Sequence, residues 1–116
     1  MSISRIVPNL TSTSLPTAQS FYGDLLGLVP VMDHGWIVTL ADGSPTGPQL
    51  SVMTEDLTAP VCPDISIQVD DVDQAWAKAR QLGAEIVHPI TDEPWGVRRF
   101  FVRDPDGHVV NILGHR

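Results

Sequence analysis

Alternating polar and apolar residues run from Asp64 to Val69 in the second half of the chain. A period of two is typical of a half-buried strand, because successive side chains point to opposite faces. If the isoleucine and valine side chains face the core, the opposite face carries a carboxylate, a hydroxyl and an amide: Asp64, Ser66 and Gln68. These groups hydrogen-bond well to a small molecule, and they predict a partly polar binding surface.

Three further side chains are suited to ligand recognition. The indole rings of Trp36 and Trp95 attract planar or cationic groups by stacking and cation–π contact, although each Trp could equally be a core or interface anchor. Arg99, on a later strand, would instead favour a carboxylate or phosphate, or pair with Asp64. The charge of the ligand therefore stays open.

The histidines and glutamates form no convincing catalytic or metal-binding set. The histidines fall beside turns or at strand and chain ends, where we expect solvated surface residues: His34, His88, His108 and His115. Three glutamates lie in loop or edge contexts: Glu55, Glu85 and Glu93. No acid–base pair, nucleophile–base arrangement or phosphate-binding glycine loop is apparent.

Composition excludes several classes of protein. A net charge of −7 with only seven Lys and Arg argues against nucleic acid as a partner, while an acidic surface serves solubility or attracts a cationic molecule. No apolar run approaches the ~18 residues of a membrane span. Cys62 is the one cysteine, so we expect an inert thiol. With no export signal at the N-terminus, the expected location is the cytoplasm.

Two helices have recognisable ends. Ser14 is a plausible N-cap of the first helix, and Gly27 ends it. Asp71 caps the second helix with Gln74 three residues on, and Gly83 closes it. Apolar residues recur at helical spacing inside both segments.

Apolar runs bounded by turn residues predict eight strands before, between and after these helices in the sequence. They are Ile3–Asn9, Leu28–Met32, Trp36–Ala41, Gln49–Met53, Asp64–Val69, Glu85–His88, Val97–Arg103 and His108–Leu113. Breaker residues predict a loop over Asp42–Pro48, and Asp104–Gly107 matches a type I turn.

The order strand, helix, three strands occurs twice, which indicates an internal duplication. We predict an α+β fold with one domain, 1–116, built from βαβββ modules at 1–54 and 64–116 joined by a linker at 55–63. The modules should pair curved mixed sheets around a shared cleft, with the helices outside. Strand parity then directs further side chains into the cleft: Asn9, Gln49, Ser51, Met53, Arg99, Phe101, Val109 and Asn111. Three of them, Met53, Phe101 and Val109, could equally fill the core.

This arrangement resembles the vicinal oxygen chelate superfamily, which includes glyoxalases, bleomycin-resistance proteins and extradiol dioxygenases. The likeness extends over nearly the whole chain. It rests on the joint order of three motifs: Phe21-Tyr22 before Leu25-Leu26-Gly27-Leu28, Val69-Asp70-Asp71-Val72-Asp73, and Asp104-Pro105-Asp106-Gly107-His108. Each motif alone is weak, and each describes helix packing, a cap or a turn rather than chemistry.

The resemblance also implies where a metal ion would bind. Metal-dependent members usually hold a divalent ion with His, Glu or Gln side chains on the first, fourth, fifth and eighth strands. The matching positions here are Val7, Ser51, Asp64 and Asn111. Only Asp64 is a good ligand, whereas a catalytic site needs about three protein donors. We therefore expect no metal cofactor.

Local likenesses point to the bleomycin-resistance proteins within this superfamily: Pro8-Asn9-Leu10, Gly35-Trp36 and Trp95-Gly96. Such relatives are homodimers that hold a planar cationic antibiotic between subunits without altering it. The resemblance implies a homodimer that sequesters a small organic ligand, with Trp36 and Trp95 stacked on it. Two alternatives stay open: a metal-dependent lyase or dioxygenase with an irregular ligand set around Asp64, and a metal-independent isomerase using Arg99 and Asp64.

Overall fold

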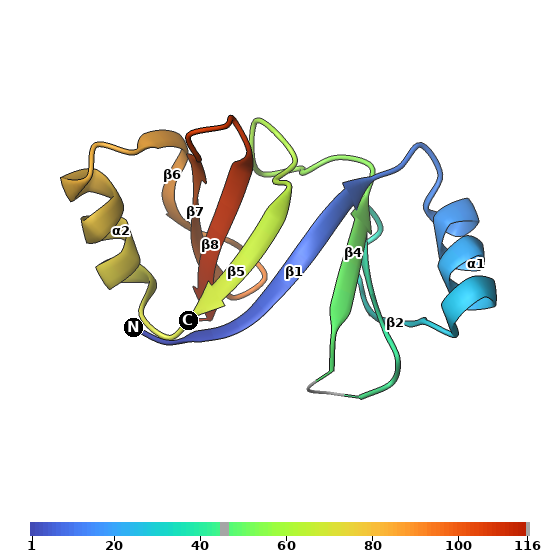
Figure 1. Ribbon diagram of the computed structural model, residues 1–116. Coiled ribbons are helices and arrows are strands. Elements are labelled where there is room, and N and C mark those ends of the chain that lie inside the picture. Colours follow the sequence, from blue (N-terminus) through green and yellow to red (C-terminus); the bar gives the residue numbers. More distant parts are fainter. Residues whose placement is uncertain (45–46, 116) are drawn as a thin grey trace. The chain divides into compact units, whose positions relative to one another are not determined.

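The computed structural model of the protein describes residues 1–44 and 47–115, so part of the loop predicted at Asp42–Pro48 lies outside the described residues (Figure 1). The fold is α+β, with helices and strands in the order β1 (Ile3–Thr11), α1 (Leu15–Leu26), β2 (Val29–Asp33), β3 (Ile37–Ala41), β4 (Gln49–Met53), β5 (Ile65–Val69), α2 (Val72–Gln81), β6 (Glu85–Asp92), β7 (Val97–Arg103) and β8 (Val109–His115). The tandem βαβββ prediction is confirmed.

Strand pairing repeats in the two halves of the chain. β1 pairs in parallel with β4, and β5 pairs in parallel with β8. The other pairs, β2 with β3, β3 with β4, β6 with β7 and β7 with β8, are antiparallel. The hydrogen-bonded order is β2-β3-β4-β1-β5-β8-β7-β6, a mixed sheet in which β2 and β6 are edge strands.

The chain forms two compact units, Val7–Cys62 and a second made of Met1–Ile6 with Pro63–Arg116. We call them the N-terminal and C-terminal units. The first residues of β1 belong to the C-terminal unit, where the Ser2 amide and carbonyl both hydrogen-bond to Asp70, at 2.8 and 3.0 Å.

Helix α1 is fixed at both ends by the predicted residues. The Ser14 hydroxyl accepts a hydrogen bond from the Thr17 amide, and Gly27 adopts a left-handed φ of 72° that ends the helix. The helix covers one face of the N-terminal sheet, where Leu15 packs with buried Val38, Leu40 and Val52. This apolar core sets the direction of the other side chains of β3 and β4.

Helix α2 plays the same part in the C-terminal unit. The Asp71 carboxylate accepts a hydrogen bond from the Gln74 amide at 3.0 Å, as the capping pattern predicted. The apolar face of the helix packs on β5, β7 and β8 in a cluster that includes Ile67, Val69, Ala75, Trp76, Phe100 and Ile112. Ile67 and Val69 therefore face the helix, as strand parity predicted.

Strand β6 differs most from its prediction, because it continues to Asp92 instead of ending at His88. Its pairing with β7 shifts register between Ile86 and His88 and again before Thr91. These irregularities break the period of two that identifies a strand in a sequence. Pro89 is tolerated because β6 lies at the edge of the sheet.

Candidate functional site

The N-terminal unit places a buried polar row on the sheet face opposite α1. Asn9 pairs in register with Ser51, and Ser51 pairs with Thr39. The hydroxyls of Ser51 and Thr39 lie 2.8 Å apart and hydrogen-bond to each other. All three side chains are buried. Sequence reasoning found Asn9 and Ser51 but missed Thr39, although alternation with the core residues of β3 gives its direction.

Three other candidates belong to this unit. Gln49 and Trp36 are half-buried, while Met53 is buried at the end of β4. The Trp36 ring stacks on the His34 ring, with centroids 6.5 Å apart and planes 24° apart. The hairpin that carries them turns at Gly35, whose φ of 84° favours glycine.

The C-terminal unit has an equivalent polar row, again opposite its helix. Ser66 pairs with Asn111, Asn111 with Phe101, and Phe101 with His88. The Asn111 side-chain amide donates a hydrogen bond to the Ser66 hydroxyl at 3.0 Å. Phe101 is fully enclosed, which is the core-filling alternative that the sequence left open for it.

Arg99 forms the centre of a buried charged cluster in this unit. Its Nη2 donates to Oε2 of Glu93 at 2.9 Å, and both side chains are at least 95% buried. The guanidinium also lies over two aromatic rings, 5.1 Å from the Trp95 centroid and 4.7 Å from the Phe101 centroid. The ion pair and the cation–π contacts stabilise a charge that would be costly to bury alone.

Two residues of this cluster contradict the sequence expectations. His88 was expected on the surface, but its residue is only 9% exposed and its ring lies 5.2 Å from that of Phe101. Glu93, expected in a loop or edge context, is 2% exposed. A tight hairpin draws Glu93 inward, because its amide donates to the Val97 carbonyl at 2.7 Å. For Arg99 the sequence left open an anionic ligand group or Asp64 as the partner, and in the structure its side chain is paired with Glu93.

The other expected ligand contacts on β5 are less enclosed. Asp64 is exposed, and its carboxylate accepts a hydrogen bond from the Val109 amide at 2.8 Å. The side chain thus helps to join β5 to β8. Gln68 is half-buried, and its backbone carbonyl accepts a hydrogen bond from the Ser4 hydroxyl at 3.3 Å.

The residues at the four positions matched to metal ligands do not suit a metal ion. Val7 is buried and has no donor atom. Ser51 is hydrogen-bonded to Thr39, and Asn111 is an uncharged amide bonded to Ser66. Asp64 contributes the one carboxylate of the set. A catalytic divalent ion needs about three such donors, so we derive no metal chemistry from these four residues.

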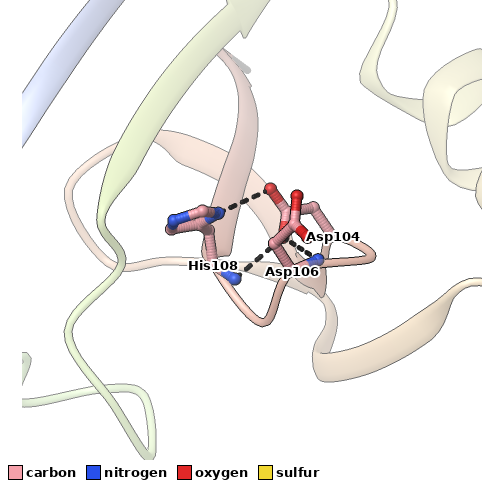
Figure 2. Close-up of side chains that lie close together, drawn as sticks. All are labelled: Asp104, Asp106 and His108. Carbon is pink, nitrogen blue, oxygen red and sulfur yellow. Dashed lines mark hydrogen bonds and ion pairs between the residues drawn. The ribbon is translucent and has the colours of Figure 1, made fainter.

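A separate cluster of possible ligands lies in the turn between β7 and β8 (Figure 2). Asp104, Asp106 and His108 bring their donor atoms within 4.8 Å of one another. However, one Asp104 oxygen accepts from the amides of Asp106 and His108, and the other contacts Nδ1 of His108 at 2.9 Å. The cluster therefore stabilises the predicted turn, which the Gly107 amide closes on the Asp104 carbonyl.

This turn changes the acidity of two side chains. Burial raises the pKa of the Asp104 carboxyl, but hydrogen bonds from His108 and from the turn amides outweigh it and lower the pKa overall. The hydrogen bond with Asp104, followed by the negative charge of Asp104, raises the pKa of His108. The two shifts have one physical cause, because each favours the ionised pair.

Cys62 lies near acidic residues. Burial raises the pKa of its thiol, and the charges of Asp56 and Glu55 raise it further. A raised pKa disfavours the nucleophilic thiolate, which agrees with the expected inert thiol.

The chain belongs to the Glyoxalase/Bleomycin resistance protein/Dioxygenase superfamily, whose family model matches residues 2–112. No curated protein matches the chain. Among the described residues, no helix is long and apolar enough to cross a membrane.

Several solved structures share the fold. A superfamily member from Vibrio splendidus has 18% identity and a TM-score of 0.72, covering 99% of this chain and 100% of that one. A variant of the Streptomyces coelicolor methylmalonyl-CoA epimerase has 17% identity and a TM-score of 0.73, covering 98% and 96%. A Legionella pneumophila protein named as an NAD-dependent benzaldehyde dehydrogenase has 20% identity and a TM-score of 0.76, covering 96% and 99%. At these identities the likeness concerns the fold alone.

Proposed function

We propose that this protein binds a small organic molecule without a metal ion, as a ligand-binding member of its superfamily. The proposal rests on one observation: the side chains at the four positions matched to metal ligands are unsuited to a metal ion. Val7 has no donor, Ser51 and Asn111 are neutral and hydrogen-bonded to neighbours, and Asp64 holds the Val109 amide. The same observation disfavours a metal-dependent lyase or dioxygenase.

Polar side chains on the two sheet faces support a ligand-binding role. Burial of polar groups is unfavourable unless they are hydrogen-bonded, and a face that only filled a core would be apolar. Each unit nevertheless has buried polar groups opposite its helix: Asn9, Thr39 and Ser51 in one, and His88, Arg99 and Asn111 in the other. These residues supply directional contacts for a bound molecule.

The proposed ligand is planar, an antibiotic or similar metabolite that is sequestered without being altered. Trp36 and Trp95 are both half-buried, so each indole retains accessible surface for stacking. We also propose that two copies of the chain form the binding cleft at a homodimer interface. Size-exclusion chromatography with light scattering tests the dimer, and a monomer at micromolar concentration would exclude it.

The distribution of charge favours a cationic group on the N-terminal unit. All seven Lys and Arg lie outside residues 7–62, which contain five acidic residues: Asp24, Asp33, Asp42, Glu55 and Asp56. Such a field attracts cations. The repulsion expected from Arg99 is reduced, because Glu93 neutralises that side chain at 2.9 Å.

Tryptophan fluorescence titration with bleomycin and with the planar cation proflavine tests this proposal. We expect saturable binding that weakens at least about tenfold in Trp36→Ala or Trp95→Ala, since lost stacking is worth about 1 kcal/mol or more. Trp76→Phe is the control, because Trp76 on α2 packs on Phe100 in the core between the helix and the sheet. Absence of binding by both compounds, or chemical conversion of either one, would contradict the proposal.

A further inference from the structure

The turn between β6 and β7 carries Trp95 on a well-defined backbone. The Glu93 amide donates a hydrogen bond to the Val97 carbonyl at 2.7 Å, and the Gly96 amide donates one to the Glu93 carbonyl at 3.2 Å. Gly96 adopts a φ of 89°, which favours glycine. These bonds fix the main chain of the turn, but they leave the rotamer of the Trp95 side chain to other contacts.

The Arg99 guanidinium supplies such a contact. Its Cζ lies over the Trp95 ring, 5.1 Å from the centroid, which is within the range of a cation–π interaction. The guanidinium is itself fixed, because Nη2 donates to Oε2 of Glu93 at 2.9 Å and Cζ lies 4.7 Å from the centroid of the Phe101 ring. A firmly held cation therefore covers one face of the indole.

Exposure increases in one direction along this series of contacts. Phe101 is fully enclosed and Arg99 is 4% exposed, whereas Trp95 is half-buried. Because the indole face toward Arg99 is covered, the accessible surface of the ring lies on its remaining sides. A planar molecule can thus reach the Trp95 ring, while the guanidinium behind it is already enclosed by protein.

We propose that Arg99, held by Glu93, is a positioning residue for Trp95. The guanidinium keeps the indole in one orientation, so that the accessible surface of the ring is ready for a planar ligand. Ordering a side chain during binding weakens affinity, and a ring that is ordered beforehand avoids this loss. The inference rests on the proposed stacking role of Trp95. It gives Arg99 a role that acts through another side chain, rather than that of an anion-binding group.

Time-resolved fluorescence anisotropy tests the positioning without any ligand. In the background Trp36→Phe/Trp76→Phe, Trp95 is the one remaining tryptophan of three. The test variant adds Glu93→Gln/Arg99→Met, which removes the guanidinium and leaves no buried charge unpaired. Methionine is flexible and does not hold a ring in one place. We expect the test variant to gain a fast decay of anisotropy, on the picosecond-to-nanosecond timescale of free side-chain motion, that the background lacks.

A double-mutant cycle separates positioning from direct contact with the ligand. Isothermal titration calorimetry measures the affinity for whichever of proflavine and bleomycin binds more tightly. Glu93→Gln/Arg99→Met should weaken binding about fivefold, the loss expected when one side chain must be ordered during binding. The same substitutions should cause no further loss in Trp95→Ala, because the ring through which Arg99 acts is absent. Glu85→Gln breaks the exposed pair with Arg103 and is the matched control for both measurements, which it should leave unchanged.

Two results would overturn the inference. One is an anisotropy decay that stays the same when the guanidinium is removed. The other is a loss of affinity that is equally large in the Trp95→Ala background, which would make Arg99 a direct ligand contact. If Glu93→Gln/Arg99→Met does not fold, Arg99→Lys replaces it in both experiments, because lysine keeps the charge beside Glu93 but lacks the planar guanidinium.

Failure of this inference is distinguishable from failure of the proposed function. If neither proflavine nor bleomycin binds, the proposed function is wrong, but the anisotropy of the free protein still tests whether Arg99 orders the Trp95 ring. If a compound binds and Trp95→Ala weakens it while the pair variant leaves the ring ordered, the proposed function stands and the positioning role is wrong.

Discussion

Removing the Glu93 carboxylate by Glu93→Gln should destabilise the protein markedly. The side chains of Glu93 and Arg99 are 3% and 5% exposed, so the substitution leaves a guanidinium charge buried without its counter-ion. Breaking a buried ion pair in this way costs about 3–5 kcal/mol. The Trp95 and Phe101 rings still contact Arg99 and offset part of that loss, which places the expected value near 3 kcal/mol. At about 4 °C per kcal/mol for a chain of this size, the melting temperature should fall by about 12 °C.

Thermal and urea unfolding followed by circular dichroism measure this change. The control is Glu85→Gln, because Glu85 on β6 and Arg103 on β7 form a 2.8 Å pair whose side chains are 65% and 37% exposed. That exposed pair should contribute less than about 1 kcal/mol. Adding Arg99→Met to Glu93→Gln should recover most of the loss, because no unpaired charge remains. The reasoning is refuted if Glu93→Gln costs no more than Glu85→Gln, or if the double variant is no more stable than the single.

Three further changes have definite expected results. Asp64→Ala removes the acceptor of the Val109 amide and should lower the free energy of unfolding by about 1–2 kcal/mol in urea titration, whereas an unchanged value would deny the strand-joining role. Asp104→Asn should lower the pKa of His108 in an NMR titration, because the hydrogen bond and charge that raise it are removed. In the wild type, the pair stabilises the fold only while both groups are ionised. Its effect is lost as pH rises through the raised His108 pKa and as pH falls through the lowered Asp104 pKa. Gly96→Ala meets no atom within 4 Å but forces a φ of 89° on alanine, so melting experiments should show a loss of about 1–2 kcal/mol, and no loss would contradict the turn geometry.

Local patterns in the sequence predicted most of the fold. Ser14, Gly27 and Asp71 act at the helix ends by hydrogen bonds and backbone angles that involve only near neighbours, so their residue types were sufficient. Repetition of the element order predicted the tandem βαβββ arrangement. The end of β6 was missed because its register shifts interrupt the alternation on which strand prediction depends.

The candidate site was predictable only in part. Alternation placed Ser51 and Asn111 on the faces opposite the helices, but it could not show which partner Arg99 has. That partner depends on the hairpin that brings Glu93 back beside β7. One signal was available: a buried arginine needs a carboxylate, and Glu93 is only six residues away in a β-turn context. His88 was misjudged because a histidine next to a turn is usually solvated.

Metal content tests the central claim most directly. The protein is purified without chelator, analysed by inductively coupled plasma mass spectrometry, and melted with and without added Zn²⁺, Ni²⁺, Mn²⁺ or Fe²⁺. Because a ligand that binds the native state raises stability, a true site would be visible in both measurements. The residues at Val7, Ser51, Asp64 and Asn111 predict far less than one metal equivalent per chain and no rise in melting temperature. About one equivalent of tightly held metal, with a melting temperature raised by the same ion, would contradict the account.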